Sequence, residues 1–207
     1  HTHPDLAANI WINADEIAGN GIDDDGNGFV DDTRGWDFGD GDNNPTDPVG
    51  HGTHVAGTIA AVGNNARGIA GVAWKAKIMP VKAFSGTTTA TSLLAQALTY
   101  AMRNDADVIN NSWGCVGGCR QNPVIEDLVR AATAAGQVVV FAAGNEGKDG
   151  FNYSPINMAE DRPLVAGAVD HLDQPSSFSN RGLPYVDVAA PGGESGPSCE
   201  DAMDNSI

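Results

Sequence analysis

The sequence predicts an α/β fold in which helices cover both faces of a mostly parallel sheet. From Ile69 onward, apolar runs of strand length alternate with segments of helical periodicity, and this alternation is typical of parallel strands joined by helices. The 207 residues suit one domain with a sizeable core. No internal repeat or domain boundary interrupts the pattern, so we expect a single domain over residues 1–207.

The elements of this fold follow from local signals. Strands are expected at 78–81, 108–109, 138–141, 164–169 and 185–188. A helix is expected where Leu93, Leu94, Ala97, Leu98, Ala101 and Met102 share one face. A second helix should begin with Asn122 as its cap and Pro123 in its first position, and should stop at Gly136.

The stretch from Asp47 to Val62 consists mainly of small residues and contains a histidine at position 51, near its start. Glycine in an exposed helix costs roughly 1 kcal/mol relative to alanine, so Gly52 and Gly57 favour a buried, closely packed helix. His51 at its N-terminal edge would be well mounted as a general base. The alternative is a core helix that happens to contain His51 and His54. The two histidines do not fit the i, i+4 spacing of zinc-metalloprotease ligands, and no Gly-x-Ser-x-Gly elbow indicates an α/β-hydrolase.

Acidic residues dominate the N-terminal quarter. The formal net charge is −16, which makes nucleic acid an improbable partner. Arg34 is the only Lys or Arg before His51. Such a cluster repels itself unless something neutralises it. It is either a solvated acidic face or tail, or a set of metal-binding loops, and the interleaved Gly, Asn and Trp residues favour loops. No apolar run approaches the ~20 residues of a membrane span.

One acidic run has the spacing of a calcium loop. Asp23, Asp25, Asn27 and Asp31 fall at the first, third, fifth and ninth positions of an EF-hand-like loop. Arg34 stands at the twelfth position, where a bidentate Glu would be expected. We therefore expect a calcium loop without the helices of a true EF-hand, and a plain acidic turn is the alternative.

Four motifs together resemble a known family. These are HPDL at 3–6, HGTHVAGTIA at 51–60, NNSWG at 110–114 and AGNEG at 143–147. In this order they resemble the subtilisin-like serine peptidases (subtilases, peptidase S8), and most closely the calcium-rich, heat-stable, secreted members. The resemblance implies a three-layer subtilisin-like fold, secretion, a monomer and polypeptide substrates bound in extended conformation.

The resemblance also implies roles for individual residues. His51 would be the general base, and Asn145 would donate an amide N–H to the oxyanion; a turn asparagine is the plain alternative for Asn145. Ser112, Trp113 and Gly114 would present backbone groups to the substrate and form one wall of a pocket, although Trp113 could equally be core.

Two to three calcium sites are expected. By resemblance, one loop would use Asp37, Asp40, Asp42, Asn44 and Thr46. A second site would use Asp5, the side chain of Asn65 and the carbonyls of Val62, Arg67 and Ile69. The EF-hand-like loop would be the third.

The sequence also departs from the family pattern. It begins after the position of the family's catalytic aspartate and ends before a nucleophilic serine segment, so we expect a domain truncated at both ends that is inactive by itself. A non-catalytic calcium-binding module, or a degenerate relative used for binding, is the alternative. Cys115 and Cys119 could close a small disulfide loop or remain free thiols, and Cys199 has no evident partner.

Overall fold

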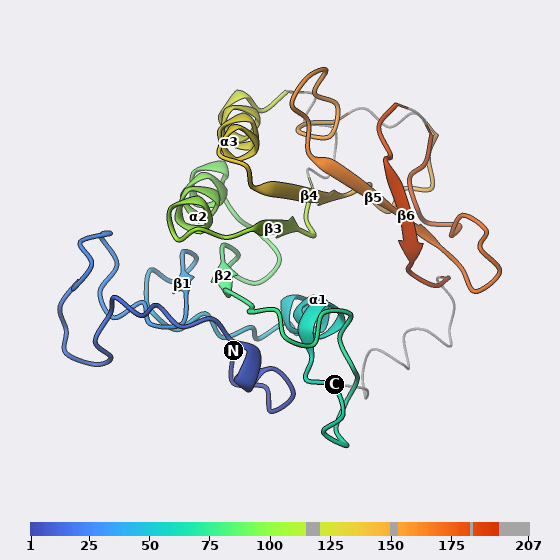
Figure 1. Ribbon diagram of the computed structural model, residues 1–207. Helices are drawn as coiled ribbons and strands as arrows, with labels where there is room; N and C mark the ends of the chain where they lie inside the picture. Colours follow the sequence, from blue (N-terminus) through green and yellow to red (C-terminus); the bar gives the residue numbers. More distant parts are fainter. Residues whose placement is uncertain (115–120, 150–152, 183, 195–207) are drawn as a thin grey trace. The chain divides into compact units, whose positions relative to one another are not determined.

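A computed structural model describes residues 1–114, 121–149, 153–182 and 184–194 (Figure 1). Its elements are a short 3-10 helix η1 (Ala7–Asn9), β1 (Trp36–Asp37), α1 (His51–Ala60), β2 (Val81–Lys82), α2 (Thr91–Arg103), β3 (Val108–Asn111), α3 (Pro123–Ala134), β4 (Val138–Ala142), β5 (Leu164–Val169) and β6 (Val188–Pro191). The described residues form two compact units, the first from His1 to Ala97 and the second from Leu98 onward.

The second unit contains a four-stranded parallel sheet. Its strand order is β3-β4-β5-β6, with Val108 opposite Val138, Val140 opposite Leu164, and Ala166 opposite Val188. Three of the predicted strands are therefore confirmed. The prediction of a strand at 185–188 was wrong in position, since β6 begins where it was expected to end. The Asp187 N–H donates to the Val165 carbonyl, but the Val165 N–H donates to the Asp187 carboxylate instead of to a backbone carbonyl.

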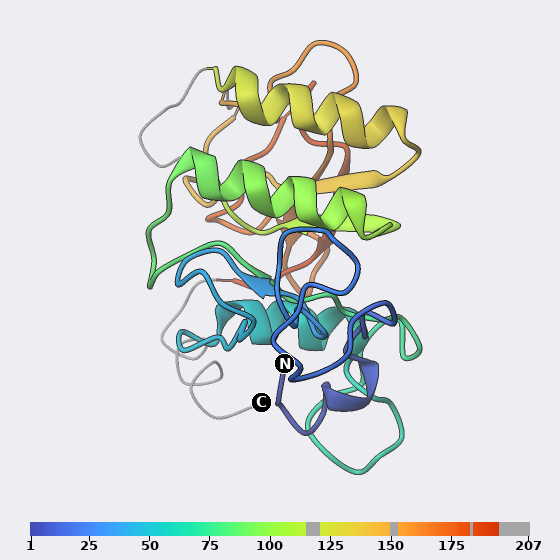
Figure 2. The same cartoon turned by 90° about the vertical axis from the view of Figure 1, so that its left-hand side faces the viewer.

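The core of the second unit lies between its helices and its sheet. Buried side chains there include Leu98, Tyr100, Ile109, Ile125, Val129, Phe141 and Val165. Helix α3 packs against β4, and Figures 1 and 2 show it beside the C-terminal half of α2. The predicted start of α3 is confirmed, because the Asn122 side chain accepts the Ile125 N–H and Pro123 follows it.

The first unit has little regular structure. β1 and β2 pair in parallel over only two residues each, with Trp36 opposite Val81. The strand expected at 78–81 is broken: Ile78 forms an isolated bridge with Ile10, whereas Val81 pairs with Trp36 in β1. Pro80 lies between them and has no N–H to donate, which accounts for the break.

Helix α1 begins at the predicted histidine, but only its C-terminal part is buried. Gly57 and Ala60 are buried, whereas His51, Gly52 and His54 are exposed. The expectation of close packing around Gly52 was therefore wrong, and the exposure of both histidines speaks against the alternative of a core helix that contains His51 and His54. The close approach lies at the other end of the helix and involves Gly71: a Cβ there would lie 2.4 Å from the Ala61 nitrogen.

The predicted disulfide loop cannot be compared with the structure, since Cys115, Cys119 and Cys199 lie outside the described residues. Among the residues that are described, no helix has the length and apolar character to cross a membrane.

Candidate active site

Two predicted site segments lie at the same edge of the sheet in the second unit. Ser112–Gly114 follows β3 and the 143–147 loop follows β4; these strands are parallel neighbours, with Asn111 opposite Phe141. The carboxyl ends of such strands are the usual place for ligands in α/β sheets. Trp113 is half-buried, and its ring meets that of Phe141 edge-on at 4.9 Å between centroids. Trp113 thus contributes to packing and is also partly accessible at this edge.

The backbone after β4 turns sharply to present Asn145. Gly144 has φ 98°, a conformation that favours glycine, and a Cβ there would lie 2.6 Å from Asn180 Nδ2 and 2.7 Å from Glu146 Oε2. Asn145 follows with an exposed side chain. Position 144 therefore requires glycine for both its dihedral angle and its surroundings, and this fixes the direction in which Asn145 leaves the sheet.

Asn180 is a supporting residue that the sequence does not reveal. It is 1% exposed, and its amide donates to the Ala143 carbonyl at 2.9 Å and to Glu146 Oε2 at 2.5 Å. Its Oδ1 accepts the Lys148 N–H, and its backbone N–H donates to the Gly144 carbonyl. One buried side chain thus holds both ends of the loop that carries Asn145. Its surroundings in sequence, Ser-Phe-Ser-Asn-Arg, look like those of any turn asparagine.

Tyr153 supports the same loop from a second direction. Its hydroxyl donates to the Ala142 carbonyl at 3.3 Å, and its ring lies against Gly114. Burial raises the pKa of Tyr153 to about 12, and the negative charge of Glu146 acts in the same direction. The hydroxyl therefore stays protonated and remains a donor at this edge through neutral and alkaline pH.

In the first unit, His51 is the first residue of α1 and is exposed. The helix start is held by Asp47, whose Oδ1 accepts the Val49 and Gly50 N–H groups and whose Oδ2 accepts the backbone N–H and hydroxyl of Thr53. Burial by itself would raise the pKa of Asp47, but these hydrogen bonds outweigh it and lower the pKa. His51 and Asn145 belong to different units, so their approach to each other is part of the proposal below.

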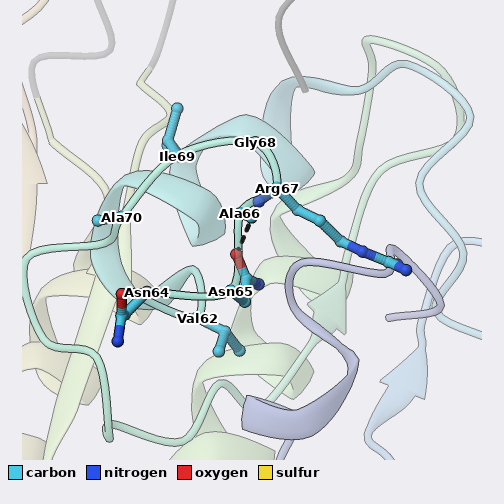
Figure 3. A pocket seen from close by; sticks show the side chains of 8 residues that line it. All are labelled: Val62, Asn64, Asn65, Ala66, Arg67, Gly68, Ile69 and Ala70. Carbon is cyan, nitrogen blue, oxygen red and sulfur yellow. Dashed lines mark hydrogen bonds between the residues drawn. The ribbon is translucent and has the colours of Figure 1, made fainter.

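The predicted ligands of the second calcium site meet around one loop. Asp5 is 1% exposed; its Oδ1 accepts the Asn65 Nδ2–H at 2.6 Å and its Oδ2 accepts the Ile69 N–H at 3.1 Å. Val62, Arg67 and Ile69 help to line a hollow of about 360 Å³. Figure 3 labels these residues and shows Asn65 Oδ1 accepting the Arg67 N–H.

This donor set fits calcium in two respects. The predicted set contains only oxygen ligands, which Ca²⁺ prefers, although Asn65 here turns its Nδ2 toward Asp5 and its Oδ1 toward the Arg67 N–H. Asp5 is a buried carboxylate, and the Asn65 and Ile69 N–H groups that it accepts are neutral. No Lys or Arg within the described ranges forms an ion pair with Asp5. A buried negative charge without a countercharge favours a bound cation.

The loop predicted around Asp37 already contains a positive charge. Lys82 Nζ lies 2.5 Å from Asp37 Oδ2 and 3.1 Å from Asp40 Oδ2. Burial by itself would lower the pKa of Lys82, but the hydrogen bonds and charges of Asp37 and Asp40 outweigh it, so the pKa lies above its ordinary value.

The other predicted ligands of that loop bond to one another. The Asp42 carboxylate accepts the Asn44 N–H, and Thr46 donates its hydroxyl to Asn44 Oδ1 and its N–H to the Asn44 carbonyl. An ammonium therefore stands where calcium bound by Asp37 and Asp40 would lie, and the two cations are alternatives.

The EF-hand-like loop is arranged differently from its expected register. Asp23 and Asp25 gather with Glu16. Asp31 instead accepts the N–H groups of Asn20 and Gly21, both at 3.0 Å. Asn27 donates its amide to Asp25 and Asp32 and accepts the Phe29 N–H. The contacts of Asn27 and Asp31 thus lend no support to their predicted role as ligands.

Comparisons with known proteins agree with the sequence motifs. The family model described as "Subtilase family" (Peptidase_S8) matches residues 1–206. The chain is 44% identical to the thermophilic serine proteinase of Bacillus sp. (strain AK1), over 77% of this chain and 38% of that protein. It is also 44% identical to thermitase of Thermoactinomyces vulgaris, over 76% of this chain and 54% of the relative.

A solved structure supports the fold. A protease from Pseudoalteromonas arctica PAMC 21717 matches 95% of this chain and 61% of its own with a TM-score of 0.72 and 36% identity. The α/β fold with a parallel sheet and flanking helices, predicted from the sequence, is thereby confirmed as subtilisin-like. The chain spans only about two fifths to about half of the two curated relatives named above. It belongs to the subtilase family of serine peptidases.

Proposed function

We propose that this chain is part of a serine endopeptidase that cleaves peptide bonds in extended polypeptides. The observation that carries the proposal is the position of Asn145, which the glycine turn and Asn180 hold at the sheet edge next to Ser112–Gly114. An amide donor beside an exposed strand end suits a carbonyl whose oxygen becomes negative during the reaction.

Each residue has a definite part in this reaction. The backbone of Ser112–Gly114 would pair with an extended substrate as an additional strand. His51 would take the proton of the nucleophile and return it to the leaving amine, and Asn145 would donate its N–H to the oxyanion. The serine nucleophile and the aspartate that orients His51 would come from protein outside these 207 residues. The 207-residue chain alone is therefore expected to be inactive.

The test uses the protein with its flanking sequence and quenched-fluorescent casein as substrate. We expect His51→Ala to lower kcat by about 10⁶ and Asn145→Leu by about 10²–10³, figures that come from subtilisin, a member of the family. His54→Gln is the matched control, because His54 is exposed on the same helix, and it should leave kcat unchanged. Full hydrolysis by His51→Ala would refute the proposal; calcium binding without any hydrolysis would favour the binding module.

We further propose that the protein works outside the cell and binds Ca²⁺ at Asp5 and Asn65. A relative from Xanthomonas campestris pv. campestris, 35% identical over 92% of this chain, is named an extracellular protease. In a calcium titration, Asp5→Asn should bind one equivalent of calcium fewer than the parent protein. An unchanged number of bound calcium ions in that variant would refute the proposed site at Asp5 and Asn65. The Asp37–Thr46 loop stays a weaker prediction, with Lys82 as the competing cation.

A further inference from the structure

Three carboxylates from two neighbouring segments meet near the start of the chain. One carboxylate oxygen each from Glu16, Asp23 and Asp25 lies within 4.8 Å of the others. With Ca–O bonds of 2.3–2.6 Å, oxygens on opposite sides of a calcium ion are about 5 Å apart, so this spacing allows all three to bind one ion. An acidic cluster alone is not a site, and the argument depends on how Glu16 is held.

Glu16 is buried with one oxygen unsatisfied. The residue is 8% exposed. Its Oε1 accepts the N–H groups of Asp24 at 2.7 Å and Asp25 at 3.3 Å, which tie it to the loop. Its Oε2 is buried and has no hydrogen-bond partner among the described residues. A buried charged oxygen without a partner is costly, and here it belongs to the carboxylate that gathers with Asp23 and Asp25.

Protein groups orient these carboxylates but do not neutralise them. Asn13 and Asn27 donate amide N–H groups to Asp25 Oδ2, at 2.9 and 3.0 Å, and the backbone of residues 27 and 28 donates to Asp23. All of these donors are neutral. Within the described part of the chain, no ion pair joins a Lys, Arg or His to any of the three acids.

We propose that Glu16, Asp23 and Asp25 form a site for a hard divalent cation, best suited to Ca²⁺. The EF-hand-like loop has Arg34 at its twelfth position, where a Glu would normally supply a carboxylate. Glu16, seven residues before the loop begins, supplies this carboxylate instead. Asp31 does not gather with these three carboxylates and accepts the N–H groups of Asn20 and Gly21 instead. The proposal is independent of the proposed peptidase activity.

The test is calcium titration calorimetry of the protein with its flanking sequence after chelation, together with melting curves in calcium and in chelator. Glu16→Gln keeps an acceptor for the Asp24 and Asp25 N–H groups but removes the charge. We expect the Glu16→Gln variant to bind one calcium equivalent fewer than the parent, or to bind that equivalent with a Kd at least about tenfold higher. Its calcium-induced rise in Tm should also be smaller. Magnesium at the same concentration should not reproduce the rise in the parent chain.

Two variants make the result specific. Asp15→Asn removes the same charge from an exposed neighbour and should retain every equivalent. Asp5→Asn should lose a different equivalent, so the double variant Glu16→Gln/Asp5→Asn should lose two. Equal stoichiometry and affinity in Glu16→Gln and the parent, or an equal loss of Tm with and without calcium, would overturn the proposal. If Glu16→Gln does not fold, the same titration is carried out with Asp23→Asn. Loss of one calcium equivalent in Asp23→Asn supports the site, and an unchanged number of equivalents refutes the proposal.

Discussion

The two units of this chain are stabilised in different ways. In the second unit, four parallel strands and two helices enclose apolar side chains such as Phe141 and Val165. In the first, the residues before α1 have one two-residue strand and depend on Asp and Asn side chains that accept backbone N–H groups. An apolar core is insensitive to dissolved ions, whereas clustered carboxylates are not. Stability should therefore depend on calcium in one unit and not in the other.

The largest effect is expected from a core substitution in the second unit. Phe141 is 1% exposed, and Phe141→Ala should lower the free energy of unfolding by about 3–5 kcal/mol. Urea unfolding should show the same loss in calcium and in chelator. Val138→Ala on the same strand is the control: Val138 is exposed, so its effect should stay within about 0.5 kcal/mol. A loss at Phe141 that appears only in chelator would contradict the comparison.

Calcium removal should act on the first unit. A single ion present at 100 times its Kd stabilises the native state by about 2.7 kcal/mol. Hydrogen exchange should therefore accelerate in chelator at the amides of Gly28 and Ile69, which donate to Asp23 and Asp5. The amides of β4 and β5 should keep their protection. Uniform acceleration along the chain would mean that the two units respond as one.

A pair of glycine substitutions separates close packing from helix propensity within the first unit. Gly71→Ala would place a Cβ 2.4 Å from the Ala61 nitrogen and 2.7 Å from the Ala60 Cα, and should cost about 1–3 kcal/mol. Gly52→Ala meets nothing closer than Asp47 Oδ2 at 3.5 Å, and should stabilise α1 by up to about 1 kcal/mol. Thermal melting of both variants checks the opposite signs. An unchanged or higher Tm in Gly71→Ala would show that packing does not require the glycine at 71.

The smallest effect concerns the helix start and its pH dependence. Asp47→Ala removes the acceptor for the first turn of α1 and should cost about 1 kcal/mol. Because the pKa of Asp47 is lowered on folding, its contribution is fully present above its unfolded pKa of about 3.9. It is lost as the pH falls through the lower folded pKa. The stability difference between parent and variant should therefore vanish in acid, and a difference that grows with acidity would contradict this role.

The sequence predicts the second unit better than the first for a physical reason. Periodicity and capping signals are local, so 108–109, 138–141, 164–169 and the start at Pro123 could be read directly. Lys82 and Asn180 act across long stretches of chain, and nothing near them in sequence marks their partners. Glu16 lies close to its loop in sequence, but the EF-hand spacing does not include it. Spacing also predicts Asp31 as a ligand, but a loop register does not reveal which backbone N–H groups a carboxylate accepts, and Asp31 accepts those of Asn20 and Gly21.

The ammonium of Lys82 contacts both Asp37 and Asp40 and offsets their negative charge without any dissolved ion. A positive charge that belongs to the polypeptide does not dissociate on dilution, and a chelator cannot remove it. In surroundings poor in divalent ions, the 37–40 turn should therefore keep its conformation while the segments around Asp5 and Glu16 loosen. Scarcity of calcium would then expose particular stretches of the first unit to cleavage before others.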